Sequence, residues 1–175
     1  MTDSTEHGPA PTVASLVGLR LSIIRRAADM LGLHFGTLRE VRTRKGHLAF
    51  VGELAVHISG PWRIDGPELT LVGQHDLFEF NGAEEPPDWS YEQGNTRLDA
   101  ELDAAFGPAV APQDWRLISE GFDVASTDVS RFGDLDIRFV NGFAIRAFPS
   151  NVTSECWRLF EVDGQTDHLV VPNYH

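Results

Sequence analysis

Two short stretches pair a tryptophan with an arginine, Trp62-Arg63 and Trp157-Arg158, and they are the part of this sequence best suited to hold a ligand. Neighbouring side chains in a strand point to opposite faces, so each indole would be buried while its guanidinium faces outward. Two converging guanidinium groups would bind one anionic group, because each presents several donors in a fixed plane. The alternative is that both stretches are core strands whose arginines form local salt bridges.

A pocket built around these strands would also use His57 or Asp76. The candidate binding residues are therefore Trp62, Arg63, Trp157, Arg158, His57 and Asp76. For His57 the alternative is a solvent-facing histidine at the rim of a sheet. A third triplet, Trp115-Arg116-Leu117, weakens the ligand-binding interpretation, since it repeats the pattern elsewhere.

The other reactive residue types show no catalytic or metal-binding pattern. The seven histidines are scattered without H-x-H or H-E-x-x-H spacing, and Cys156 is the single cysteine. The motifs G-x-S-x-G and G-x-G-x-x-G are absent as well. We therefore expect no catalytic residues, no metal and no cofactor, and we interpret Cys156 as a buried small hydrophobe.

Charge is distributed unevenly along the chain, whose net charge is -12. From residue 16 to 63 there are eight Lys and Arg against three acids, and from residue 65 to 136 there are seventeen acids against three Arg. The acidic segment argues against a nucleic-acid surface, because phosphate binding needs basic residues. It suits a basic protein partner, because complementary potentials raise association rates. The alternative is a solvated surface that keeps the protein soluble.

Size and composition indicate one globular domain. The chain has 175 residues, of which 42% are hydrophobic and 10% aromatic. We expect a disordered leader over residues 1–14 and a single domain over residues 15–175. The lone cysteine favours a cytoplasmic location, and no stretch reaches eighteen apolar residues, so we expect no membrane association.

The sequence contains an internal repeat that predicts two copies of one β-meander. The aligned pieces are 31–35 with 135–139, 54–58 with 143–147, and 62–64 with 157–159. The half-repeats cover about 17–73 and 120–172, joined by a connector over 74–119. The predicted fold class is α+β, mostly β, with antiparallel strands and one helix in the connector.

The second copy has the clearer pattern. Leu135, Ile137 and Phe139 alternate with polar residues, which is typical of a half-buried strand. Asn141-Gly142 then predicts a type I′ turn with two positive-φ residues, and the alternation resumes at Phe143.

The first copy contains a conflict at residues 22–33. Local propensity and spacing favour a helix there, whereas the repeat favours two strands joined by a turn around residues 27–29. We favour the hairpin, because tertiary context overrides propensity. An insertion over 36–53 would hold another hairpin, with strands at 38–43 and 47–51 and a turn at Arg44-Lys45-Gly46.

One helix is predicted within the connector. Thr96 with Asp99 resembles a capping box, and Leu98, Leu102 and Phe106 share one face before Gly107-Pro108 ends the run.

Several motifs resemble a family of uncharacterised bacterial proteins. They are residues 26–30 leading to 33–36, residues 55–58 with 61–64, residues 76–78, residues 94–95 with 98–99, and residues 157–160 with 168–171. In relatives we expect a cysteine or similar residue in place of Gly60. The half-repeat is also similar to small bacterial proteins suspected of neutralising toxins. The resemblance implies no activity.

These observations give two functional hypotheses, beside the plainer possibility of a housekeeping oligomer subunit without a ligand. The first is a non-enzymatic protein-binding module, immunity-like, that binds a basic protein through the acidic segment. The second is a small-molecule domain for an anion, or an unrecognised enzyme, with its pocket near the two Trp-Arg strands.

Overall fold

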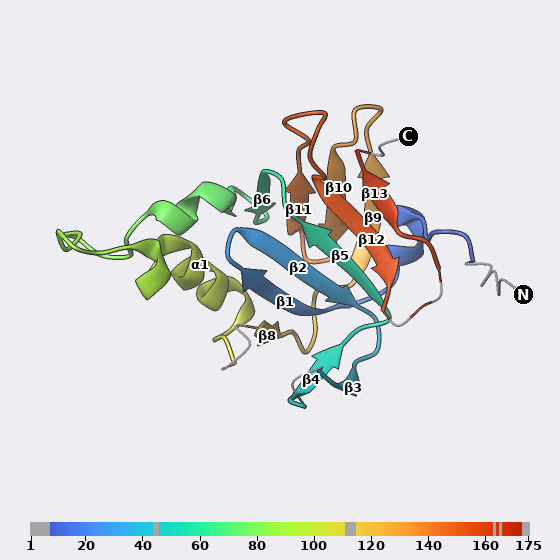
Figure 1. Ribbon diagram of the computed structural model, residues 1–175, viewed down its shortest axis with the longest axis horizontal. Coiled ribbons are helices and arrows are strands. Elements are labelled where there is room, and N and C mark those ends of the chain that lie inside the picture. The colour runs from blue at the N-terminus through green and yellow to red at the C-terminus, as the bar shows by residue number, and fades with distance from the viewer. Residues whose placement is uncertain (1–7, 44–45, 111–114, 163, 165, 173–175) are drawn as a thin grey trace, which may run out of the picture.

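Two antiparallel sheets face each other in the computed structural model, which describes residues 8–43, 46–110, 115–162, 164 and 166–172 (Figure 1). The six-stranded sheet has the order β13-β12-β5-β2-β1-β8, with β1 Leu21–Ala27, β2 Met30–Phe35, β5 Leu54–Ile58, β8 Trp115–Leu117, β12 Trp157–Glu161 and β13 Leu169–Val171. The five-stranded sheet has the order β7-β6-β11-β10-β9, with β6 Trp62–Asp65, β7 Thr70–Gly73, β9 Val124–Val129, β10 Leu135–Phe139 and β11 Ala144–Ala147. The mostly β, antiparallel fold class is confirmed.

The two halves of the chain have the same strand topology. Exchanging β1, β2, β5, β6 and β7 for β9, β10, β11, β12 and β13 converts the order of one sheet into that of the other, with β8 as an extra edge strand. The register agrees as well: Leu33 lies opposite Val56 in one half, and Ile137 lies opposite Ile145 in the other. Each half therefore gives three strands to one sheet and then crosses over to give two to its partner.

Residues 22–33 form a hairpin, as the repeat predicts. Strands β1 and β2 pair from Leu21 to Phe35, and Ala28 takes a positive φ of 53° in the turn between them. Strand β1 also pairs with β8, and β2 with β5. Pairing on both sides satisfies the backbone groups of these strands, so it outweighs the local helix propensity.

The predicted hairpin β10–β11 is present, but its turn type is different. Gly142 has a φ of 87°, whereas Asn141 is not among the residues with positive φ. The Gly142 N–H donates to the Phe139 carbonyl at 3.1 Å, and the Phe139 N–H donates to the Phe143 carbonyl at 2.9 Å. The loop therefore has three residues ending in a left-handed glycine, which replaces the predicted type I′ turn.

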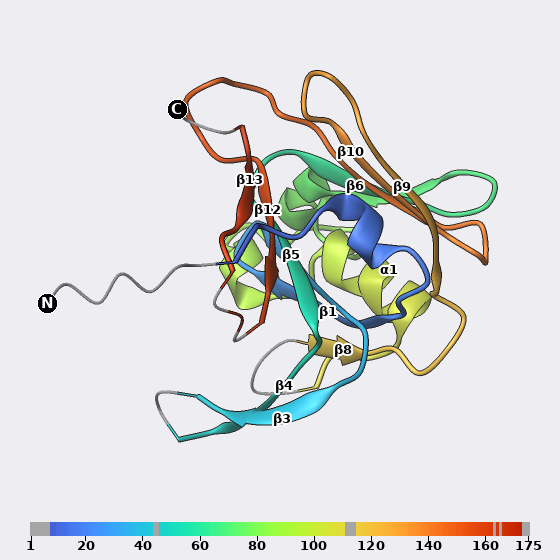
Figure 2. The same cartoon turned by 90° about the vertical axis from the view of Figure 1, so that its right-hand side faces the viewer.

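A further hairpin of β3 Arg39–Arg42 and β4 Leu48–Val51 stands apart from both sheets. In Figure 2 it projects beyond the six-stranded sheet, on the side away from the five-stranded sheet. Arg44 and Lys45 of its predicted turn lie outside the described residues, and Gly46 has a φ of 81°.

The connector holds the helix α1 Arg97–Phe106, as predicted. The Thr96 hydroxyl accepts a hydrogen bond from the Asp99 N–H at 3.0 Å, which caps the first turn, and the helix ends at Gly107. Leu98, Leu102 and Phe106 are buried against the core between the sheets. The connector also contains the 3-10 turns η2 Gln74–Phe78 and η3 Tyr91–Gln93, and it supplies β8 to the six-stranded sheet.

The start of the domain lies earlier than residue 15. Gly8 forms a bridge with Thr166, and the 3-10 turn η1 Val13–Leu16 buries Leu16 completely. The predicted leader therefore ends in residues that pack against the sheets, while residues 1–7 lie outside the described part. In that described part, no helix is long and apolar enough to cross a membrane.

Candidate functional site

The two tryptophans of the Trp-Arg strands belong to the core. Trp62 is 3% exposed and Trp157 is fully buried. The Trp62 indole N–H donates to the Asp29 carbonyl at 3.2 Å, and that of Trp157 donates to the Gly133 carbonyl at 2.8 Å. Both acceptors lie in the first hairpin turn of the respective half, so these side chains tie each half together.

The two arginines do not converge, and the structure shows the alternative, in which each arginine pairs with a nearby carboxylate. Arg63 lies on the outer face of the five-stranded sheet, where its Nε donates to Asp65 at 3.2 Å and its guanidinium covers the Phe148 ring at 5.3 Å. Arg158 lies on the six-stranded sheet and makes two hydrogen bonds to Glu155, at 2.5 and 2.7 Å. Each half crosses from one sheet to the other before its last strands. The Trp-Arg strands of the two halves, β6 and β12, therefore lie in different sheets, and their arginines face opposite sides of the molecule.

The contacts of Asp76 are with the connector and with neither Arg63 nor Arg158. Its carboxylate accepts the Gly73 N–H at 2.7 Å at the start of η2 and lies 3.7 Å from the Arg97 Nε. Asp76 therefore stabilises the local fold of the connector.

His57 and Arg158 do lie together, and a residue that sequence reasoning missed lies beside them. Arg25, Gly32, His57 and Arg158 face one another in register across β1, β2, β5 and β12, and we call this line the Arg25 row. The Arg25 Nη2 lies 3.3 Å from the His57 Nε2. Burial, followed by the charges of Arg25 and Arg158, lowers the pKa of His57 to about 4, so its ring is neutral at pH 7.

Arg25 lies across Gly32 because this position has no side chain. A Cβ at Gly32 would come within 2.9 Å of the Arg25 Nε. Among the described residues no carboxylate lies within 4 Å of its guanidinium, and burial lowers the pKa of Arg25. The internal repeat held a signal for this site, because the position of Gly32 in the first half is occupied by Asp136 in the second.

The β3–β4 hairpin covers one side of this face. Phe50 stacks on Trp115 with the ring centroids 5.5 Å apart, and the Gly52 N–H donates to the His34 Nδ1 at 3.3 Å. His34 is 4% exposed, and burial lowers its pKa to about 4. Trp115 is the cross-strand neighbour of Arg25, so the covered region adjoins the Arg25 row.

An acidic surface lies at a different place, on the connector. Residues 74–106, which we call the acidic connector, carry nine acids and one arginine. In Figure 1 this segment runs from green to yellow-green and projects to the left of the sheets. The acids exposed on it are Glu79, Glu84, Glu85, Asp88, Glu92 and Asp103.

Aromatic side chains accompany these acids. Phe78 is 51% exposed and Tyr91 37%, and their rings meet edge to face with centroids 5.1 Å apart. His75 adds a third ring, 6.3 Å from Phe78. Exposed aromatic rings next to charged groups are typical of protein-binding surfaces.

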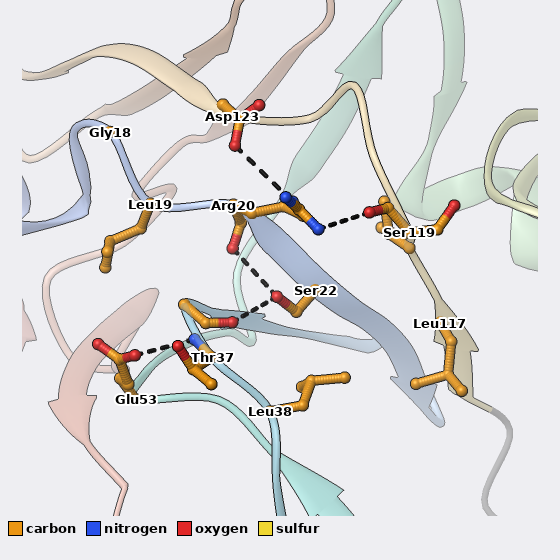
Figure 3. A pocket seen from close by; sticks show the side chains of 12 residues that line it. Gly18, Leu19, Arg20, Ser22, Thr37, Leu38, Glu53, Leu117, Ser119 and Asp123 are labelled. Carbon is orange, nitrogen blue, oxygen red and sulfur yellow. Dashed lines mark hydrogen bonds and ion pairs between the residues drawn. The ribbon is translucent and has the colours of Figure 1, made fainter.

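A cleft of about 620 Å³ is lined by the start of β1 and the segments that follow β2 and β8 (Figure 3). Its Arg20 donates to the Ser119 carbonyl at 2.6 Å and lies 3.8 Å from Asp123. The Glu53 carboxylate accepts the Thr37 N–H at 2.9 Å, and this hydrogen bond holds the pKa of Glu53 below its usual range. The charged groups of the cleft thus have partners within the protein.

The described residues contain no group of three or more His, Cys, Asp or Glu arranged to hold a metal ion. Cys156 is 3% exposed, and burial raises its pKa to about 11, so the thiol is protonated at pH 7. A Cβ at Gly60 would come within 2.5 Å of the Cys156 Sγ. In this chain, the side chain that we expect in relatives at position 60 would collide with Cys156.

A scan against protein-family models, a search of curated proteins and a search of solved structures each found no match.

Proposed function

We propose that the protein is a non-enzymatic binding module that holds a basic protein partner on its acidic connector. The observation that carries this proposal is the combination of nine acids with an exposed aromatic pair, Phe78 and Tyr91, on one projecting segment. We include in the proposal a cytoplasmic location and the immunity-like role that the half-repeat resembles.

Internal ion pairs involve only some of the connector acids. Asp76 pairs with Arg97, Asp99 with Arg26 at 3.0 Å, and Asp103 with Arg116 at 2.8 Å. Glu79, Glu84, Glu85, Asp88 and Glu92 form no such pair with a described residue. These carboxylates keep the connector strongly negative, which raises the rate at which a basic partner arrives.

The aromatic pair supplies the affinity that the exposed charges alone do not. Exposed pairs of opposite charge contribute little affinity, whereas a few aromatic side chains at the centre of an interface contribute most of it. The faces of Phe78 and Tyr91 would also accept lysine or arginine side chains from the partner through cation–π contacts. The proposed interface therefore has an aromatic centre and an acidic rim.

The test is capture and reconstitution with two variants of equal net charge. One variant carries Glu84→Gln, Glu85→Gln and Glu92→Gln on the connector, and the control carries Glu40→Gln, Glu68→Gln and Glu120→Gln elsewhere. All six residues are exposed. A partner captured from native cells is purified, mixed with each variant and measured by titration calorimetry at low and high salt.

We expect a basic partner that binds the wild type and the control equally at low salt. The connector variant should bind about tenfold more weakly, and high salt should weaken all binding. Phe78→Ala should weaken the affinity for the partner by a further tenfold or more. Failure to capture any partner, or equal binding by the connector variant, would overturn the proposal.

A further inference from the structure

The Arg25 row has a counterpart on the opposite sheet, and the two rows differ in charge. Across β9, β10, β11 and β6 the counterpart residues are Asp128, Asp136, Arg146 and Arg63, which we call the Asp136 row. Its arginines have carboxylate partners, because Arg146 bonds to both Asp136 and Asp65, and Arg63 bonds to Asp65. The charges of the Asp136 row thus balance within the protein, although the Asp136 Oδ1 is buried without a hydrogen-bond partner.

The Arg25 row lacks the equivalent carboxylate. Gly32 stands where the other row has Asp136, and Arg25 stands where it has Asp128. Arg158 is neutralised by two hydrogen bonds to Glu155, so the uncompensated positive charge of the row is that of Arg25. A half-buried cation without an anion is costly, since burial removes its hydration.

Two buried donors beside this charge have no acceptor. The Arg25 Nε and the Trp115 Nε1 are both buried without a hydrogen-bond partner. The two residues are direct cross-strand neighbours of β1 and β8, and Trp115 is 8% exposed. Buried donors are normally satisfied, so two such donors side by side, one of them in a guanidinium that has no carboxylate partner, indicate that an acceptor belongs there.

We propose that the Arg25 row binds the carboxylate of a small organic acid, with Arg25 as the principal donor. This site lies on a different surface from the acidic connector and does not depend on the function proposed above. Guanidinium groups bind carboxylates through paired, charge-assisted hydrogen bonds. The neutral His57, 3.3 Å from the Arg25 Nη2, fixes the orientation of the guanidinium.

The surroundings favour a ligand with an apolar body. Phe160 contacts His57 edge to face at 4.9 Å and stacks on His168 at 4.8 Å, at one end of the row. The Phe50–Trp115 stack stands at the other end. Aromatic side chains thus flank the cation on both sides, whereas a fully hydrated anion would need polar surroundings.

The experiment follows the protein by NMR during titration with cyclohexanecarboxylate at pH 7. The Nε–H resonance of Arg25 and the ring resonances of His57 report on the site. Acetate, inorganic phosphate and the neutral cyclohexanemethanol are titrated in parallel. Two variants are compared, Arg25→Gln and the control Arg138→Gln, whose arginine is exposed and bonded to Asp136 on the opposite sheet.

We expect saturable shifts of both reporters with cyclohexanecarboxylate, weaker binding of acetate and phosphate, and none of the alcohol. Arg25→Gln should lose at least about tenfold in affinity, while Arg138→Gln should bind as the wild type does. In the wild type, saturation should also raise the pKa of His57, since the bound anion offsets the charge of Arg25.

Three results would overturn the proposal. They are shifts that do not saturate, binding that persists in Arg25→Gln, and phosphate binding as tight as that of the organic acid. If Arg25→Gln fails to fold, the pKa of His57 in the wild type decides the matter, and a value unchanged by saturating ligand counts against it.

Discussion

The Asp136 row and the Arg25 row occupy equivalent places in two halves with the same strand topology, but they treat charge in opposite ways. On the five-stranded sheet, Asp136 accepts hydrogen bonds from Arg138 at 2.9 Å and Arg146 at 3.2 Å. On the six-stranded sheet, the positions of Arg138 and Arg146 are held by His34 and His57, and no acid stands between them. One row is an ion-pair network, and the other has neutral rings around an arginine that has no carboxylate partner among the described residues.

This difference shows that the fold and the chemistry of its outer faces are specified by different residues. The inward-facing residues of both halves are apolar, so the two halves together build one sandwich from the same strand topology. The outward-facing residues are free to diverge, because their packing is looser. The face that lacks an internal carboxylate is the one where we propose that a ligand binds.

The largest expected effect tests whether the two halves depend equally on their tryptophans. Trp62→Ala and Trp157→Ala each remove a buried indole and its hydrogen bond, and each should lower the free energy of unfolding by about 3–5 kcal/mol. Urea denaturation followed by fluorescence and circular dichroism measures both. A loss at one position that is small beside the other would show that only one half needs its tryptophan.

The milder pair Trp62→Phe and Trp157→Phe sharpens the same comparison. The Asp29 carbonyl that accepts the Trp62 indole N–H also accepts the Gln74 amide at 3.2 Å, whereas the Gly133 carbonyl has no second donor among the described residues. Trp157→Phe should therefore cost about 1 kcal/mol more than Trp62→Phe, since it leaves a carbonyl without a protein donor.

Acid sensitivity should reside on the six-stranded sheet. The pKa of His34 is about 4 in the folded protein and about 6.5 in the unfolded chain, so below pH 6.5 the unfolded chain binds protons that the native state does not. The free energy of unfolding should then fall by about 2–3 kcal/mol between pH 7 and 4.5 through His34 alone. His57 acts in the same direction.

The variant His34→Asn isolates this effect, because its side-chain oxygen can still accept the Gly52 N–H but does not titrate. Urea denaturation at the two pH values should show a smaller loss for the variant than for the wild type. The control is His47→Asn, an exposed position on the β3–β4 hairpin. Equal losses of unfolding free energy in the wild type and in His34→Asn would show that His34 does not cause the acid sensitivity.

Opening the ion-pair network should have a smaller effect. Asp136→Asn weakens the charge-assisted bonds to Arg138 and Arg146, and we expect a loss of about 1–2 kcal/mol in the free energy of unfolding. Glu120→Gln, at an exposed acid outside the row, is the control and should be neutral. A neutral Asp136→Asn would mean that the ion pairs of this row add nothing to stability.

Much of the fold could be predicted from sequence, because alternation along β10 and the match between the halves fix which residues face inward. The connector helix was also predictable from Thr96 and Asp99. Alternation does not say which sheet a strand joins, however, so a site shared by Arg63 and Arg158 was compatible with the sequence although β6 and β12 lie in different sheets. Arg25 was missed for a related reason, since its proximity to His57 depends on the register of three strands.

The smallest expected effect concerns the two turns whose carbonyls accept the tryptophan indole N–H groups. Ala28 in the β1–β2 turn has a φ of 53°, a conformation that costs a residue with a side chain about 1–2 kcal/mol. The equivalent β9–β10 turn has Gly133 at a φ of 89°, where this strain does not arise. Ala28→Gly relieves the strain but makes the unfolded chain more flexible by about 0.4–1 kcal/mol. The net gain in the free energy of unfolding should be about 0.5 kcal/mol. Ala27→Gly, at the exposed end of β1 without positive φ, should instead lose about 0.5–1 kcal/mol, and a loss at both positions would show that the left-handed turn is not strained.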